Sequence, residues 1–368
     1  MGSDFAELHD ELRAVARELL GAADPESGVE WSLLAASGWL GLEVPEACDG
    51  AGATFAEVAV VLEEMGRTAS RSAYLGSTVL GVEALVLVEA GPERDRLLRD
   101  AVAGEAVPVL ALPGEDEAAS AGAWEAPFRI ERPDGRVIVH GRAEFVPDGA
   151  EADRLLLPAR DADGRPVVVC LAAGAAGVTP TAQPVLDATR RLAVVSADGV
   201  EVDEAAVWGF AGDPEAAVVR LRDRAAVAVA CDSLGLSEAM LDATVAYATV
   251  RQQFGRAIGS FQAVKHACAD MQVQISVARE LVAAAVDALA GTDPFASSDA
   301  DCSVAASMAA SFTCAAAVDV VGKAMQLHGG IGYTWESGIH VYLKRAVLNR
   351  SLFGSPAAHR RRLAARHL

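Results

Sequence analysis

The sequence predicts a chain of three parts, in which a β-rich middle is flanked by two helical regions. Apolar residues recur at helical spacing up to about residue 105, and again from Asp213 onward. Between these regions the spacing changes, and short runs of β-forming residues alternate with turn residues. The chain has 368 residues, of which 52% are hydrophobic, so it can fill more than one core. We therefore expect a mainly α-helical protein with domains at 1–105, 106–212 and 213–368.

The first region is predicted to be entirely helical. Five apolar residues between Phe5 and Leu19, three or four positions apart, predict an amphipathic helix over 4–20. Thr54 followed by Glu57 is the pattern of a capping box, which begins a second helix that ends near residue 66. Two further helices are expected at about 73–90 and 94–104.

The middle region is predicted to form a small antiparallel barrel or sandwich. Turn sequences separate two pairs of strands, Pro133-Asp134-Gly135 in one case and Asp161–Gly164 in the other. No helical pattern of 10–15 residues intervenes, which argues against parallel βαβ units. The expected strands are 107–112, 128–132, 136–140, 154–158, 167–171, 191–196 and 199–202.

The third region is predicted to be an antiparallel four-helix bundle. Long helices joined by short connections favour this arrangement over others. Alanine-rich stretches such as Ala225–Ala230 would let the helices approach closely, in a bundle core or at a subunit interface. The expected helices are 213–250, 259–290, 297–328 and 336–354.

Composition excludes several classes of function. The net charge of -20 argues against binding to nucleic acid or to an anionic membrane surface. No run approaches the roughly 20 apolar residues of a membrane helix, and the N-terminus carries Asp4 where a secretory signal would be basic. The six cysteines are scattered, without a metal-like pattern of cysteine and histidine. We expect a cytoplasmic protein with free thiols and no metal.

The segment Arg251-Gln-Gln-Phe-Gly255 follows the first long helix of the bundle. An arginine at a helix C-terminus complements the helix dipole, and Gly255 is a residue expected just past a helix end. This would explain both residues without a ligand. Alternatively, the guanidinium of Arg251 binds a phosphate in a bidentate manner. Spacing alone leaves both interpretations open.

The segment Gln326-Leu-His-Gly-Gly-Ile-Gly-Tyr333 follows the third long helix. Its three glycines within four positions let a ligand lie against the backbone, where amide donors are available. The side-chain amide of Gln326 could pair with an adenine edge. The alternative is an ordinary glycine-rich loop between helices, with His328 and His340 as structural residues. No strand precedes the segment, so it is not a dinucleotide-binding fingerprint.

Together, in this order and on these helices, the two segments resemble the acyl-CoA dehydrogenase family. The resemblance covers essentially the whole chain, because the α–β–α order and the length also match. It implies that these segments reach across a subunit interface to an FAD bound mainly by a neighbour. Arg251 would hold the pyrophosphate, Phe254 would pack nearby, and Gln326, Gly329 and Gly330 would contact the adenosine half. It also implies a dimer or tetramer, an acyl-CoA substrate and an electron-transfer partner.

The same resemblance identifies residues that depart from the family. The family reaction needs a carboxylate base, which removes the α-proton of an acyl-CoA while flavin accepts the β-hydride. Phe353 occupies the usual base position near the C-terminus, and Ala225 occupies the position used by a minority of members. Ala111–Gly114 and Phe145–Pro147 stand where members carry the hydroxyl and indole groups that touch the isoalloxazine ring.

These departures lead to one main hypothesis and three alternatives. The chain is similar to the non-catalytic subunit of heterotetrameric acyl-CoA dehydrogenases of the steroid-degradation type, which completes the FAD site of a catalytic partner. The first alternative is a self-sufficient homo-oligomeric dehydrogenase in which Asp232 is a displaced base. The second is a flavin-dependent oxidase or monooxygenase on the same fold. The third is a helical binding or scaffold protein without flavin.

Overall fold

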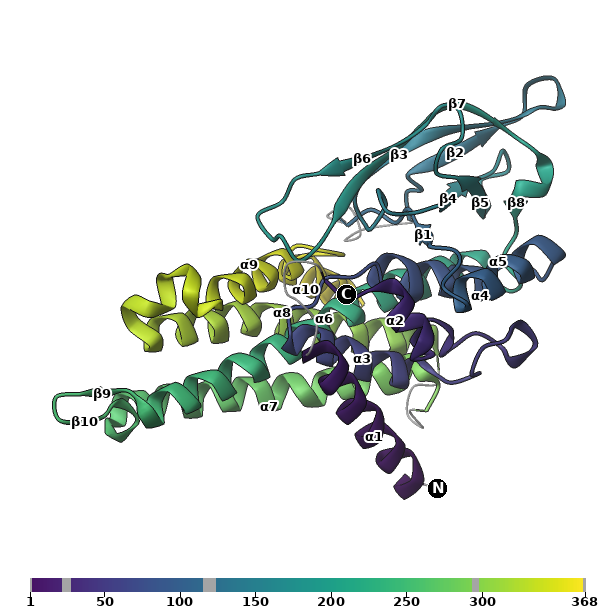
Figure 1. Ribbon diagram of the computed structural model, residues 1–368. Coiled ribbons are helices and arrows are strands. Elements are labelled where there is room, and N and C mark those ends of the chain that lie inside the picture. The colour runs from purple at the N-terminus through teal and green to yellow at the C-terminus, as the bar shows by residue number, and fades with distance from the viewer. Residues whose placement is uncertain (1, 22–27, 115–123, 293–297, 367–368) are drawn as a thin grey trace.

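The computed structural model describes residues 2–21, 28–114, 124–292 and 298–366. It has the expected order of helices, sheet and helices. Figure 1 shows the sheet lying over one end of a long helical bundle, together with the N-terminal helices. A slender hairpin projects from the other end of the bundle. The predicted fold class is confirmed.

The N-terminal helices are α1 (Gly2–Gly21), α2 (Trp31–Ala36), α3 (Phe55–Arg67), α4 (Glu83–Leu87) and α5 (Pro92–Val102). The predicted capping box begins α3, because the Thr54 hydroxyl accepts from the N–H of Ala56 and the Glu57 carboxylate accepts from that of Thr54. Leu75–Val82, in the expected helix at 73–90, is instead π-helical. A Cβ added at Gly76 or Gly81 would lie within 2.2 Å of a carbonyl oxygen of the sheet domain. This segment therefore packs directly on the backbone of the middle domain.

The middle domain is a single mixed sheet with the order β6-β7-β3-β2-β4-β5-β8, and β1 lies beside β4. Both predicted turns connect antiparallel neighbours, β2 to β3 and β4 to β5. However, β4 is parallel to β1 and to β2, so the pairing is not purely antiparallel. The strands are β1 (Pro108–Leu110), β2 (Phe128–Glu131), β3 (Val137–Pro147), β4 (Arg154–Arg160), β5 (Pro166–Ala172), β6 (Val178–Gln183), β7 (Leu192–Val202) and β8 (Val207–Trp208).

The strands differ from the sequence prediction in several places: β8 was not predicted, and β3 continues to Pro147, beyond the expected end at residue 140. The expected runs at 191–196 and 199–202 are one strand, β7, which continues through Asp198 and Gly199. The strand β6 was not predicted, because its sequence is mostly polar and includes Pro180. It is the edge strand of the sheet, where a proline removes no hydrogen bond from the ladder.

The C-terminal bundle consists of α6 (Pro214–Val250), α7 (Gln262–Ala290), α8 (Asp299–His328) and α9 (Ile339–Asn349), followed by α10 (Pro356–Ala365). The first three agree with the predicted helices to within three residues at each end. The fourth is shorter than predicted: it begins after Gly338, which has a positive φ, and ends at Asn349, five residues before the expected end at 354. One core cluster joins the N-terminal helices to the bundle, and a second lies within the sheet.

The helix α8 is long and apolar enough to cross a membrane when only length and composition are considered. However, 56% of the apolar window is buried inside the protein. A core helix of a helical bundle meets the same criterion, so this property does not indicate a membrane span.

Asp148 joins the sheet to the N-terminal helices and predicts a pH dependence of stability. Its carboxylate accepts a hydrogen bond of 2.9 Å from the N–H of Gly76, and burial raises its pKa to about 7. The folded chain therefore holds a proton that the unfolded chain has released by about pH 4. We expect the free energy of unfolding to fall as pH rises from about 4 to 7, with an Asp148 contribution on the order of a few kcal/mol.

Asp148→Asn keeps an acceptor for Gly76 and removes this titration. Urea unfolding between pH 4 and 7 should therefore give a shallower decline in stability than in the unmodified chain. The same slope in both proteins would contradict the assignment.

Candidate functional site

The two predicted cofactor segments lie at the same end of the bundle. Arg251 follows the last residue of α6, and Gln326 lies in the last turn of α8. This is the end from which the hairpin projects, far from the sheet (Figure 1). The structure thus brings together two segments that are about 75 residues apart in sequence.

The first segment forms a hairpin rather than a helix stop. The N–H of Arg251 donates to the Tyr247 carbonyl at 2.9 Å, after which β9 (Gln252–Gln253) pairs with β10 (Arg256–Ala257). Phe254 and Gly255 form the turn, with φ of 53° and 77°. Gly255 therefore serves a two-residue hairpin turn, in which both central residues need positive φ, and does not terminate the helix.

Phe254 occupies this turn at a conformational cost. A residue with a Cβ in the left-handed region loses about 1–2 kcal/mol, and asparagine or glycine would avoid most of this loss. Phe254 is 91% exposed, and its one ring contact among the described residues is edge-on with Phe261, with the centroids 6.2 Å apart, so packing within this part of the chain offsets little of the cost. The positive φ and high exposure of Phe254 fit the prediction that it contacts another molecule.

The glycines of the second segment have different roles. Gly329 has φ 64° and ψ -142°, a conformation that is largely restricted to glycine. A Cβ at Gly332 would lie 2.5 Å from the carbonyl oxygen of Met325, so this glycine permits close packing on α8. A Cβ at Gly330 would meet no atom within 4 Å in the described part of the chain. The chain itself does not require a glycine at 330, which fits a position that a ligand approaches closely.

Gly330→Ala should separate this ligand role from a structural one. The free energy of unfolding should stay the same or rise by less than about 1 kcal/mol, because the added methyl group has room. The affinity for FAD should fall by about tenfold or more, because the methyl group occupies the ligand side. Gly332→Ala is the matched control, which should lose about 1–3 kcal/mol of stability. FAD titration and thermal unfolding measure the two effects, and unchanged FAD affinity in Gly330→Ala would contradict the role.

All five predicted cofactor residues are exposed on the single chain: Arg251, Phe254, Gln326, Gly329 and Gly330. Ligand sites within one chain are usually concave and bury most of the ligand. Residues arranged on an open surface can enclose a ligand only with a second chain. The residue types suit a dinucleotide, since a guanidinium matches a phosphate and open backbone permits close approach.

The segments expected at the flavin-ring positions, Ala111–Gly114 and Phe145–Pro147, also lie close to Phe353, near the sheet. The N–H of Phe353 donates to the Gly114 carbonyl at 2.6 Å, and the N–H of Gly114 donates to the Glu144 carbonyl at 3.1 Å. A Cβ at Gly114 would lie 2.5 Å from the Phe145 carbonyl oxygen and 2.8 Å from the Leu352 side chain. Phe353 is buried and has no group that accepts a proton. Among the described residues, Gly114, Phe145, Leu352 and Phe353 thus pack closely against one another.

The two other positions considered for a base lie on α6 inside the bundle. Ala225 is fully buried. Asp232 is also fully buried and accepts hydrogen bonds from Arg345 at 3.0 Å and from Asn349 at 2.6 Å. Arg190 lies 3.1 Å from the same carboxylate. The two arginines and the asparagine hold the pKa of Asp232 at about 2 against the opposing effect of burial.

Asp232 is therefore poorly suited to act as a base, because a carboxylate stabilised in its ionised form has little tendency to take a proton. Neighbouring elements instead satisfy Asp232 as a buried, hydrogen-bonded carboxylate. Its partners come from α9 and from the connection between β6 and β7. The network thus joins the bundle to the middle domain.

The histidines beside the second segment have structural contacts. His328 stacks on Tyr247 and forms a 2.8 Å hydrogen bond with the Ala324 carbonyl. His340 lies edge-on against the exposed Trp335. The described residues contain no group of His, Cys, Asp and Glu side chains arranged to hold a metal ion.

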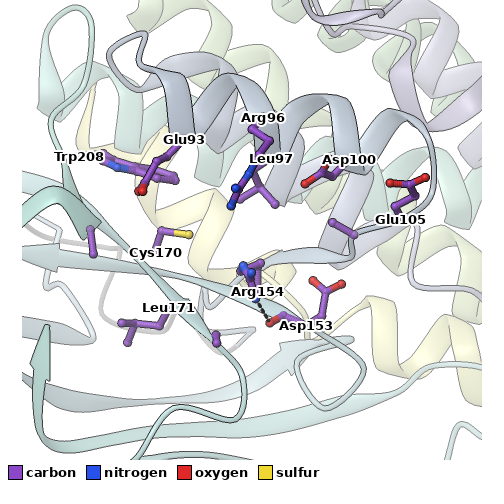
Figure 2. A pocket seen from close by; sticks show the side chains of 13 residues that line it. Glu93, Arg96, Leu97, Asp100, Glu105, Asp153, Arg154, Cys170, Leu171 and Trp208 are labelled. Carbon is purple, nitrogen blue, oxygen red and sulfur yellow. Dashed lines mark hydrogen bonds between the residues drawn. The ribbon is translucent and has the colours of Figure 1, made fainter. Parts of the chain in front are cut away.

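A cavity of about 350 Å³ lies between α5 and the sheet, away from both segments. Figure 2 shows Arg96, Leu97 and Asp100 extending from the helix toward Arg154 and Cys170 on the strands. Charges of both signs line this cavity, and burial raises the pKa of the Cys170 thiol to about 11. A thiol with so high a pKa is a weak nucleophile at neutral pH, so the cavity carries no obvious chemistry.

Sequence comparison supports the resemblance. The acyl-CoA dehydrogenase C-terminal domain matches residues 218–368, and the N-terminal domain matches residues 4–105. The acyl-CoA dehydrogenase IpdE2 of Mycolicibacterium smegmatis is 32% identical over 96% of this chain and 94% of its own length. IpdE2 of Mycobacterium tuberculosis is 34% identical over 90% of this chain and 85% of its own length. The chain belongs to the acyl-CoA dehydrogenase family.

Solved structures of acyl-CoA dehydrogenases have the same fold. The ChsE4–ChsE5 complex from Mycobacterium tuberculosis matches with a TM-score of 0.84 and 26% identity, over 98% of this chain and 96% of that one. A variant of the Tcur3481–Tcur3483 steroid ACAD matches with a TM-score of 0.82 and 26% identity, over 98% and 97%. Butyryl-CoA dehydrogenase from Megasphaera elsdenii, at 20% identity and a TM-score of 0.84, shows the fold alone over 98% of each chain.

Membership in the family confirms two predictions. The chain is an oxidoreductase of the acyl-CoA dehydrogenase family. The predicted cofactor, FAD, is the cofactor of that family. The roles of the individual site residues remain predictions.

Sequence analysis missed residues that connect these segments. Tyr247, one turn before Arg251, and Arg190, Arg345 and Asn349 around Asp232 were not identified. The only sequence signal for the second group was Asp232 itself, because a carboxylate in an apolar helix requires a buried partner. Nothing in the sequence showed which residues would supply it.

Proposed function

We propose that this chain is the base-lacking subunit of an acyl-CoA dehydrogenase complex and completes the FAD site of a catalytic partner. The complex would desaturate an acyl-CoA thioester between its α and β carbons. One observation carries the proposal: the base position is filled by buried Phe353, whereas the cofactor segments are exposed at the far end of the bundle. FAD supplies the hydride acceptor in such a complex.

The distance between the two half-sites supports a shared arrangement. Asn349, four residues before Phe353, bonds to Asp232, which is 18 residues before the end of α6 at Val250. At a rise of 1.5 Å per residue, 18 residues span about 27 Å. One flavin would lie beside the chain's own middle domain. At this distance, the exposed residues Arg251 and Gln326 would contact a different flavin, held mainly by another chain.

The roles of the exposed residues follow from their chemistry. Arg251 would bind the pyrophosphate with its guanidinium, and Phe254 would pack beside it. Gln326 would pair with the adenine edge, and Gly329 and Gly330 would let the adenosine approach the backbone. Each role orients the cofactor and does not require a base in this chain.

The relatives are consistent with this assignment. Two structural neighbours above 25% identity pair two different chains, ChsE4 with ChsE5 and Tcur3481 with Tcur3483. We infer by analogy that this chain also assembles with a second, catalytic chain, and that an electron-transfer partner reoxidises the flavin. A steroid-derived acyl-CoA would be one candidate class of substrate.

Turnover by the separated and combined chains tests the proposal. The chain alone should not desaturate acyl-CoA substrates with an artificial electron acceptor, and the complex should do so. Replacing the carboxylate base of the partner should abolish turnover of the complex. Desaturation by this chain alone at a rate ordinary for the family would contradict the proposal, and oxygen-dependent oxidation would indicate an oxidase instead.

A further inference from the structure

One pair of aromatic side chains links the two exposed segments directly. The rings of Tyr247 and His328 are stacked, with centroids 4.5 Å apart and planes 20° from parallel. Tyr247 lies one turn before Arg251 on α6, and His328 lies between Gln326 and Gly329 at the end of α8. The contact is therefore located where both segments leave their helices.

Hydrogen bonds extend this link to the backbone of each segment. The Tyr247 hydroxyl donates to the His328 carbonyl at 3.4 Å, immediately before the first glycine. The Tyr247 carbonyl accepts from the N–H of Arg251 at 2.9 Å. His328 is held in turn by Nδ1, which donates to the Ala324 carbonyl at 2.8 Å. A shift of Tyr247 would thus move the start of both segments.

We infer that Tyr247 and His328 are a positioning pair, which sets the spacing between the phosphate-binding hairpin and the glycine segment. This inference rests on the proposed function, because it assumes that Arg251 and the glycine segment bind the same FAD. A ligand that is bound by two separate contacts binds tightly only when the distance between the contacts matches the distance between its own bound groups. Tyr247 and His328 are half-buried behind the exposed residues, so they act through them.

If Tyr247 had only a structural role, its loss would lower stability without a specific loss of FAD affinity. Tyr342 offers a matched comparison, because its hydroxyl also donates to a backbone carbonyl, that of Arg67 at 2.9 Å. It is also half-buried but joins α9 to the N-terminal helices. Loss of Tyr342 should therefore affect stability without changing the spacing of the two segments.

The test measures FAD affinity in the FAD-binding oligomer by titration of the flavin-depleted protein. Tyr247→Leu should weaken FAD binding about tenfold, whereas Tyr247→Phe, which keeps the stack, should stay within about threefold. Tyr342→Leu should leave FAD affinity unchanged. His328→Leu removes the stack from the other side and replaces Tyr247→Leu if that variant does not fold.

A double-mutant comparison separates this inference from the proposed function. In a chain that already carries Arg251→Ala, adding Tyr247→Leu should lower FAD affinity by less than about threefold. One of the two contacts whose spacing Tyr247 sets is already absent in that chain. The positioning role would be overturned if the losses of FAD affinity from Arg251→Ala and Tyr247→Leu were fully additive. It would also be overturned if Tyr247→Leu and Tyr342→Leu lowered FAD affinity equally. If Arg251→Ala itself left FAD affinity unchanged, the proposed function would fail instead.

Discussion

Asp232→Asn should lower the free energy of unfolding by about 3–5 kcal/mol while leaving turnover per folded complex unchanged. The substitution leaves Arg345 and Arg190 in the interior without their carboxylate, and both are at least nine-tenths buried. Removal of one partner from a buried ion pair is costly because the remaining charge is not solvated. Urea unfolding would measure the loss of stability.

Asp242→Asn is the control on the same helix. Asp242 also pairs with an arginine, Arg67 at 2.7 Å, but its side chain is 69% exposed. An exposed ion pair contributes about 0–1 kcal/mol, so the free energy of unfolding of this variant should remain close to that of the unmodified chain. Unchanged stability together with lost turnover in Asp232→Asn would contradict this account and would identify Asp232 as the base.

The same network predicts a loss of stability in acid. The pKa of Asp232 is lowered to about 2 in the folded chain, below the value of about 3.9 in an unfolded one. The carboxylate therefore contributes stability that is present above pH 4 and lost as pH falls toward 2. Asp232→Asn should lack this part of the acid transition.

Arg251→Ala should weaken FAD binding by about 10- to 150-fold without loss of stability. A hydrogen bond to a charged group contributes about 1.5–3 kcal/mol, and each 1.4 kcal/mol corresponds to a factor of ten in affinity. The Arg251 side chain is exposed at the base of the hairpin, so its removal creates no cavity. Flavin fluorescence during titration of the flavin-depleted complex would measure the change.

Two further variants show whether the guanidinium itself is responsible. Arg251→Lys keeps the charge but not the bidentate geometry, so its loss should be intermediate. Arg361→Ala changes the net charge equally at an exposed position of α10 and should have no effect. An equal loss in Arg361→Ala would mean that only overall charge matters, which contradicts a phosphate contact at Arg251.

The long elements could be predicted from sequence because local patterns determine them. The period of apolar residues located α6, α7 and α8, and the Thr54–Glu57 pair located the start of α3. The π-helix at Leu75–Val82 could not be predicted, because it depends on contacts of Gly76 and Gly81 with the sheet. Tertiary packing overrides local propensity in such segments.

The candidate site was predictable in composition but not in geometry. The glycine motifs marked Arg251 and Gln326 as candidates, and the family resemblance marked Phe353 as a departure at the expected base position. The hairpin turn at Phe254 and Gly255 could not be distinguished by sequence from a helix stop, because both structures use glycine at positive φ. The partners of Asp232 come from distant parts of the chain, and a single sequence does not show such contacts.

The visible absorption spectrum of the purified chain tests the central claim most directly, because it reports the ratio of flavin to protein. The account predicts little or no flavin in the chain expressed alone. Co-expression with the catalytic partner should give about one flavin for every two chains of the complex. About one FAD per chain in the protein expressed alone would contradict the account and would indicate a self-sufficient homo-oligomer.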